Sequence, residues 1–140
     1  MKPHHAETKV KGSFIAPRVV FAGPLPPPNH GMAIVNKIML ELISEHVTVK
    51  SFAVQPKSLR RSFNYHLTKA MRAIWALLGI LRERFFGARV LYASVDDGLG
   101  AIWTIAFVIC ARITGLEIFL HHHSYKYIIK KARLINALVS

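Results

Sequence analysis

The sequence is poor in cysteine, in acidic residues and in long apolar runs. Its single cysteine, Cys110, excludes an internal disulfide framework and a four-cysteine zinc site. The longest uncharged apolar run, residues 98–111, has 14 residues, fewer than the roughly 20 that a membrane-spanning helix needs. Residues 1–17 are mostly polar and their only apolar run is Phe14 to Ala16, so they lack the apolar core of a secretory signal. We expect residues 1–17 to form a disordered lead-in.

Acidic residues are far outnumbered by basic ones. The chain has 7 Asp and Glu against 19 Lys and Arg, a formal net charge of +12 with neutral histidines. Such an excess favours a polyanionic partner, which is nucleic acid, an anionic membrane surface or a phosphorylated ligand. The hydrophobic share of 52% is enough to build the core of one domain, which excludes wholesale disorder.

Strand-like and helix-like segments alternate along residues 18–140. Short β-branched or aromatic runs predict strands, and runs with apolar residues three or four apart predict helices. The predicted strands are residues 18–22, 46–53, 89–94 and 116–121, and the predicted helices are 31–44, 65–86, 99–114 and 125–139. This order predicts an α/β domain, a parallel sheet with helices on both faces. Ligands of such sheets bind beyond the carboxyl ends of the strands, so we expect loops 23–31, 94–98 and 121–124 to carry function.

Apolar residues recur at regular spacing on two of the predicted helices. On the first helix, four of them fall on one face, with Ile43 beside them: Ile34, Val35, Ile38 and Leu42. On the second helix, six recur at spacings of four and three: Leu67, Met71, Ile74, Leu78, Leu81 and Phe85. This spacing is typical of a face that packs on the core. The third helix is apolar almost all round, which predicts burial on several sides. Asn29 is the expected cap of the first helix, and Gly115 is the expected end of the third.

The loop GPLPPPNHG, residues 23–31, connects the first strand to the first helix. Gly31 at the helix start lets a ligand approach the backbone, where free N–H groups and the helix dipole favour an anion such as a phosphate. The loop has neither the glycine pattern of a dinucleotide site nor the Gly-Lys-Ser/Thr of a P-loop. A rigid strand-to-helix turn is the alternative interpretation.

Polar residues also end the third and fourth predicted strands. Because side chains alternate along a strand, His121 and His123 share a face and His122 points to the other. A His-x-His pair is a zinc candidate, but no third ligand is evident, so we expect no metal. A histidine there is otherwise a candidate to bind a hydroxylated substrate or to move a proton, or it faces solvent. Asp96 and Asp97 fit a base or a magnesium ligand, but a turn and helix cap is favoured.

The stretch from Lys50 to Arg89 contains nine basic residues and a single acid, Glu83. Aromatic residues are interleaved with them: Tyr65, Trp75, Phe85 and Phe86. Such a stretch could lie on an anionic bilayer, and a solvated basic face is the alternative. No recognised nucleic-acid-binding motif is present, so we expect no nucleic acid as partner.

Three stretches together resemble the start of a family 4 glycosyltransferase of the GT-B fold. They are RVVFAGPLPPPNHGMAIVN, VLYASVDDGLGAIW and IFLHHHSYKYI, in the family's order within residues 18–140. The resemblance implies a Rossmann-like N-terminal domain that receives the acceptor and faces a second domain that holds the nucleotide-sugar. It implies transfer to an acceptor hydroxyl without an essential metal, with no cofactor and the nucleotide-sugar as co-substrate.

The resemblance also implies roles for particular residues. The family's glycine loop maps to His30, Gly31 and Met32, which are therefore expected to bind substrate. His123, followed by Ser124, matches the family's His-Ser/Thr pattern best and is the expected catalytic residue. The further expected substrate-binding residues are His122, Ser124 and Asp96.

The family's pattern continues beyond Ser140 with the donor-binding half, including its basic residues and its Glu-x7-Glu pair. We therefore expect residues 18–140 to be an incomplete acceptor domain, inactive alone, with the other half supplied by a separate chain or a longer one. The expected acceptor is a cell-envelope or lipid-linked glycan, and the expected location is cytoplasmic, peripheral on the inner face of the cell membrane. Two alternatives stay open: a small basic α/β module that binds anionic membrane or nucleic acid without catalysis, and a membrane protein with two short spans.

Overall fold

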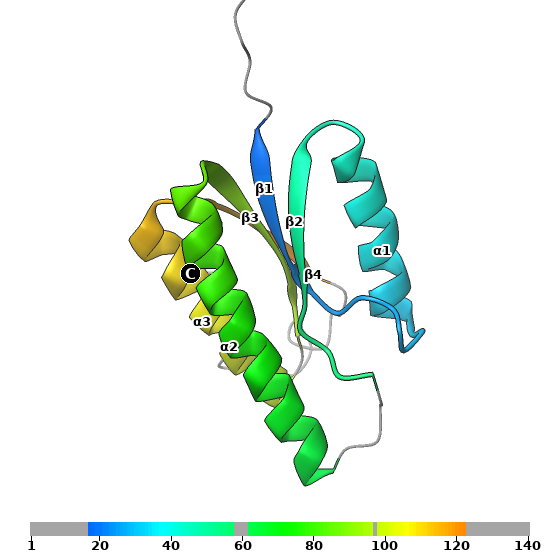
Figure 1. Ribbon diagram of the computed structural model, residues 1–140. Coiled ribbons are helices and arrows are strands. Elements are labelled where there is room, and N and C mark those ends of the chain that lie inside the picture. The colour runs from blue at the N-terminus through cyan, green and yellow to red at the C-terminus, as the bar shows by residue number, and fades with distance from the viewer. Residues whose placement is uncertain (1–16, 58–61, 97, 123–140) are drawn as a thin grey trace, which may run out of the picture.

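Four parallel strands and three helices make up the part of the chain that the structure describes (Figure 1). The computed structural model describes residues 17–57, 62–96 and 98–122. The elements are β1 (Arg18–Gly23), α1 (Gly31–Ser44), β2 (Thr48–Ala53), α2 (Phe63–Phe85), β3 (Ala88–Val95), the short 3-10 turn η1 (Gly98–Gly100), α3 (Ala101–Thr114) and β4 (Glu117–His122). The predicted lead-in, apart from Pro17, and the last predicted helix lie outside the described residues.

The sheet is parallel throughout, with the strand order β2-β1-β3-β4. Helix α1 covers one face, and α2 and α3 lie together on the other (Figure 1). The predicted α/β fold is therefore confirmed, and its arrangement is Rossmann-like. None of the helices within the described ranges is long and apolar enough to cross a membrane.

Each face of the sheet has its own apolar cluster. Because side chains alternate along a strand, neighbouring residues of β1 and β3 serve opposite faces. On the α1 face, Val19, Phe21 and Tyr92 form the cluster, and the rings of Phe21 and Tyr92 stack with centroids 5.0 Å apart. The larger cluster lies under α2 and α3: Val20, Ala22, Leu91 and Ala93 of the strands, Ala73, Ala76 and Ile80 of α2, and Phe107 and Ala111 of α3.

The apolar faces predicted to pack on the core point outward instead. On α1, the four residues Ile34, Val35, Ile38 and Leu42 are 39–51% exposed, and the helix packs through Ala33, Met39, Leu40 and Ile43. On α2, the six residues Leu67, Met71, Ile74, Leu78, Leu81 and Phe85 are 38–90% exposed. The interpretation of these positions as core was wrong, except at Ile43.

Close approach of α2 to the sheet explains this inversion. The buried side of α2 carries the small residues Ala73, Ala76 and Gly79. A methyl group at position 79 would lie 2.1 Å from Cζ of Phe52, so the interface has no room for a large side chain there. The prediction for α3 was also wrong in part, because Ile109 and Ile113 are exposed.

The helix ends agree only partly with the sequence prediction. His30, not Asn29, is the cap residue of α1, and no side chain caps that helix end. Gly115 ends α3 as predicted, with a left-handed φ of 70° that favours glycine. At the start of α2, the Ser62 hydroxyl accepts a hydrogen bond from the backbone N–H of Tyr65 at 3.3 Å.

Candidate functional site

The strand order reverses between β1 and β3, because the chain runs from β1 outward to β2 and then back across β1. Open parallel sheets bind their ligands at such a switch point, beyond the carboxyl ends of the strands. Two described segments leave the sheet there, residues 24–30 after β1 and, after β3, residue 96 with residues 98–100. They overlap two of the three loops that the sequence singled out.

A buried asparagine joins the two strands at the switch point. Asn36 of α1 is 0% exposed, and its Nδ2 donates to the carbonyl oxygen of Pro24 at 2.9 Å and to Oγ of Ser94 at 3.1 Å. The packing beside it is tight, since a methyl group on Gly23 would lie 2.5 Å from the Ser94 hydroxyl. Asn36 therefore fixes the loop after β1 against the end of β3.

Replacing Asn36 by alanine should lower the free energy of unfolding by about 2 kcal/mol. The substitution leaves the buried Pro24 carbonyl without its donor and opens a cavity. Urea denaturation followed by circular dichroism measures the change. The neighbouring Lys37→Ala is the control, because Lys37 is exposed and makes only a surface pair with Glu41, and it should stay within about 0.5 kcal/mol of wild type. Equal stabilities for the two variants would contradict the role given to Asn36.

Polar contacts also tie α2 to the loops at this edge. Nε2 of His30 donates to Oε1 of Gln55 at 2.8 Å. The backbone carbonyl of Gln55 in turn accepts from Nη1 of Arg72 at 2.6 Å. Lys69, one turn earlier on α2, forms an ion pair with Asp96 at 2.7 Å, and both side chains are mostly buried. The loops after β1, β2 and β3 are thus all held through α2 or Gln55.

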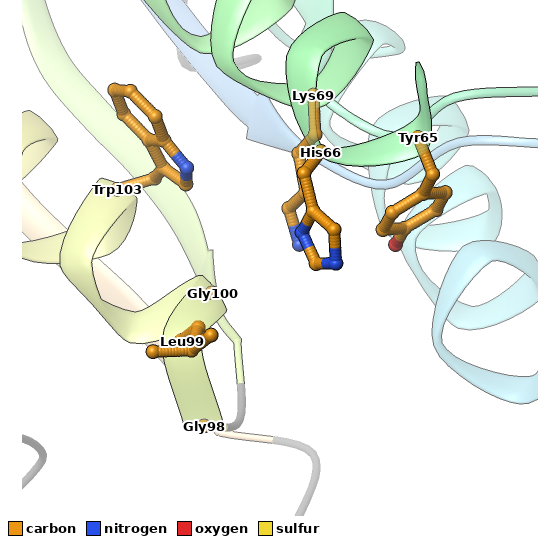
Figure 2. Close-up of a pocket in the computed structure, with 7 residues that line it drawn as sticks. All are labelled: Tyr65, His66, Lys69, Gly98, Leu99, Gly100 and Trp103. Atoms are coloured by element: carbon orange, nitrogen blue, oxygen red, sulfur yellow. The ribbon is translucent and has the colours of Figure 1, made fainter. Parts of the chain in front are cut away.

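A pocket of about 370 Å³ opens between the first turns of α2 and the start of α3 (Figure 2). Its lining is Tyr65, His66, Lys69, Gly98, Leu99, Gly100 and Trp103. In Figure 2, the three side chains from α2 lie across the hollow from Trp103 and Leu99. The pocket therefore combines two aromatic rings with an imidazole and an ammonium group, at the same edge as the switch point.

Most residues of this pocket were not predicted from the sequence. Tyr65 and Lys69 were counted only as members of the basic stretch, and His66 and Trp103 were not singled out. A signal was available in Gly98 and Gly100, which flank Leu99 directly after a strand end. A methyl group on Gly100 would lie 2.7 Å from Cβ of Asp96, so glycine is needed there for close approach.

The expected site residues that the structure describes all lie at this edge. His30, Gly31 and Met32 begin α1, Asp96 follows β3, and His122 ends β4. Asp96 is bound by Lys69, and its backbone N–H donates to the Thr104 hydroxyl at 3.4 Å. Asp97, His123 and Ser124 lie outside the described residues. No group of three residues that could hold a metal occurs within residues 17–57, 62–96 and 98–122.

His121 and His122 leave the end of β4 on opposite faces, as the alternation predicted. His121 lies on the α1 face, where its Nδ1 is 2.5 Å from the hydroxyl oxygen of Tyr92. Burial raises the pKa of Tyr92, which keeps the phenol protonated and able to donate to this nitrogen. His122 lies on the face covered by α2 and α3, beside Val95 in the register.

The fold and this edge define a Rossmann-like α/β domain with a candidate ligand site at its switch point. Comparisons with protein-family models, with curated proteins and with solved structures found no match for this chain.

Proposed function

We propose that the chain is the acceptor-binding domain of a glycosyltransferase, which transfers a sugar from a nucleotide-sugar to an acceptor hydroxyl of a cell-envelope or lipid-linked glycan. One juxtaposition carries the proposal. Within the described residues, each stretch that resembles family 4 glycosyltransferases contains the carboxyl end of a strand, and these ends lie at one edge of the sheet. Beside this edge is a pocket of about 370 Å³ that combines aromatic rings with hydrogen-bonding groups.

The pocket has the chemistry to hold a sugar ring. Trp103 and Tyr65 offer aromatic surface to the apolar C–H face of a pyranose. His66 and Lys69 offer hydrogen-bonding groups for hydroxyls, and Asp96 fixes the Lys69 ammonium at 2.7 Å. We therefore assign acceptor binding to this pocket.

The start of α1 is suited to the donor side of the reaction. The first N–H groups of a helix favour a phosphate, and α1 has no side-chain cap that would occupy them. Nothing lies within 4 Å of a methyl group built on Gly31, so the backbone is open to approach there. During transfer, the acceptor oxygen bonds to the anomeric carbon as that carbon loses its bond to the phosphate oxygen. The proton of the acceptor hydroxyl passes to the departing nucleoside diphosphate.

The two tryptophans of the chain provide a matched test. Trp103 lines the pocket, whereas Trp75 lies on the outward side of α2 and is 70% exposed. Titration of the 15N-labelled chain with a panel of short glycans should shift the indole N–H signal of Trp103 and leave that of Trp75 in place. Trp103→Ala should weaken glycan binding at least tenfold, which corresponds to about 1.4 kcal/mol. Trp75→Ala should leave glycan binding unchanged.

Two outcomes would contradict the proposal. One is the absence of any glycan that shifts the Trp103 signal. The other is a Trp103 shift by single-stranded oligonucleotides and by no glycan, which would favour a nucleic-acid-binding module instead.

A further inference from the structure

We infer that the outward face of α2 docks on an anionic lipid bilayer, with the helix lying in the plane of the membrane. We call this surface the outer face of α2 and define it by Leu67, Met71, Ile74, Leu78, Leu81 and Phe85. These residues follow one another at spacings of four, three, four, three and four, so they form one continuous stripe. They are 38–90% exposed. The helix has 23 residues and is therefore about 34 Å long.

This stripe is unusual for a soluble surface. Monomeric proteins rarely expose a contiguous apolar patch of such extent unless it binds something. The stripe extends sideways to Trp75, which is 70% exposed, and the adjacent helix α3 exposes Ile109 at 53% and Ile113 at 80%. Tryptophan at the border of an apolar face is typical of a helix at a membrane interface, because its ring suits the headgroup level.

The charges around the outer face of α2 indicate which partner binds it. The exposed cationic side chains of α2 and α3 are Arg82, Arg84 and Arg112, and the single acid of these two helices is Glu83. Lys69 and Arg72 of α2 are instead bound to Asp96 and to the Gln55 carbonyl. Glu83 is only 6% exposed and lies against Arg18 of β1, so it adds no negative charge to the outer side. The acids Glu41 and Glu45 belong to α1 and its end, on the other face of the sheet. An apolar stripe bordered by cations is complementary to anionic headgroups over an acyl layer.

The same charges disfavour two other binding partners, a second copy of the chain and nucleic acid. A second copy packed through this face would bring like charges together, including Arg82, whose guanidinium lies 5.2 Å from the centre of the Phe86 ring at the rim. Nucleic acid would pair with the cations but would leave the apolar stripe in contact with phosphates and water. A bilayer satisfies both features at once.

Docking in this orientation would bring the pocket near the lipid headgroups. Tyr65 and His66 of the pocket lie on the first turns of α2, at one end of the outer face. A lipid-linked acceptor would then reach the pocket from the membrane surface. This last step rests on the proposed function, whereas the docking surface does not.

Vesicle binding tests the inference with two matched leucines. Leu78 lies on the outer face of α2 and is 54% exposed, and Leu42 lies on the outward side of α1 and is 51% exposed. The chain should co-sediment with vesicles of phosphatidylcholine and phosphatidylglycerol, and its tryptophan fluorescence should shift to shorter wavelength. Leu78→Ser should weaken this binding about tenfold, because it removes apolar surface from the bilayer contact. Leu42→Ser should leave it unchanged.

Charge and salt provide a second measurement. Arg82→Gln should weaken binding about fivefold with phosphatidylglycerol present, the effect of one cation near an anionic surface. The loss should be smaller in vesicles of phosphatidylcholine alone. Raising the salt to about 1 M should reduce binding to the anionic vesicles, because exposed charges are then screened.

Three outcomes would overturn the inference. The first is no binding to the anionic vesicles, and the second is an equal loss in Leu42→Ser. The third is a dimer in the absence of lipid that Leu78→Ser dissociates, which would assign the outer face of α2 to a second copy. Circular dichroism of each variant shows that it is folded. A negative glycan titration with normal vesicle binding would contradict the proposed function and leave the docking surface standing.

Discussion

Replacing Ala76 by leucine should lower the free energy of unfolding by about 2 to 3 kcal/mol, the usual range for overpacking a core. Ala76 is 0% exposed and lies in the cluster between α2 and the sheet. Nearby, the Phe52 ring already occupies the space that a methyl group on Gly79 would need. Three extra carbon atoms must therefore displace the helix or force strained rotamers.

Leu78→Ala is the matched change on the opposite side of α2. Leu78 is 54% exposed, so its truncation should lower the free energy of unfolding by less than about 1 kcal/mol. Urea denaturation of both variants measures the two effects. The apolar spacing taken alone predicts the reverse order, with a loss of about 2 to 5 kcal/mol for truncation of a buried leucine. That reverse order would mean that α2 packs on the sheet through its leucines.

The order of strands and helices could be predicted because its signals are local. Each strand is a short β-branched or aromatic run, and glycine or proline marks several of the connections, as at Gly23 and Gly115. Alternation of strand and helix then restricts the fold to a parallel sheet with helices on both faces. The ranges predicted for the three described helices agree with the structure to within about two residues, the usual uncertainty of helix ends.

The side of each helix that packs on the sheet could not be predicted in the same way. A period of three and four residues shows that large apolar side chains share a face, and it does not show where that face points. Ala73, Ala76 and Ile80 follow the same spacing on the other side of α2 and form an alternative packing face. The tight contact between α2 and β2 favours that face, and this contact depends on Phe52, which is distant in sequence.

The candidate site was predictable in its position and not in its partners. Topology alone brings the ends of β1, β3 and β4 to one edge, so His30, Asp96 and His122 were expected to lie there. Gln55 and Trp103 were not, because their roles depend on residues far along the chain, such as the His30 that contacts Gln55. Asn36 carried a usable signal, since it is a neutral polar residue within an apolar helical stretch, AIVNKIML.

The one acid of the basic stretch leads to the second large effect. Glu83 is only 6% exposed, and its Oε2 lies 3.4 Å from Nη1 of Arg18 at the start of β1. Arg18 also reaches the backbone carbonyl of Phe86, just beyond the end of α2. The pair therefore joins the C-terminal end of α2 to the first strand. Arg18 also neutralises the Glu83 carboxylate, which lies on the side of α2 that faces the sheet.

Arg18→Ala should lower the free energy of unfolding by about 3 kcal/mol, the lower end of the range for breaking a buried ion pair. The lower end applies because the Arg18 side chain is itself 36% exposed, which lets water screen the pair. The loss arises mainly from the Glu83 carboxylate, which stays buried without its counter-charge. Adding Glu83→Gln to the Arg18→Ala variant should therefore recover part of the stability, because a neutral amide replaces the unpaired charge.

Urea denaturation of the two single variants and the double variant gives the coupling energy between the residues. The exposed pair between Lys37 and Glu41 is the control, with nitrogen and oxygen 3.8 Å apart, and breaking it should change the free energy of unfolding by less than about 0.5 kcal/mol. Additive losses in the double variant would mean that Arg18 contributes through the Phe86 carbonyl alone. If the double variant is more stable than Arg18→Ala alone, the loss arises from the buried Glu83 charge. Glu83 then faces the sheet, which is the orientation of α2 that leaves its leucines exposed.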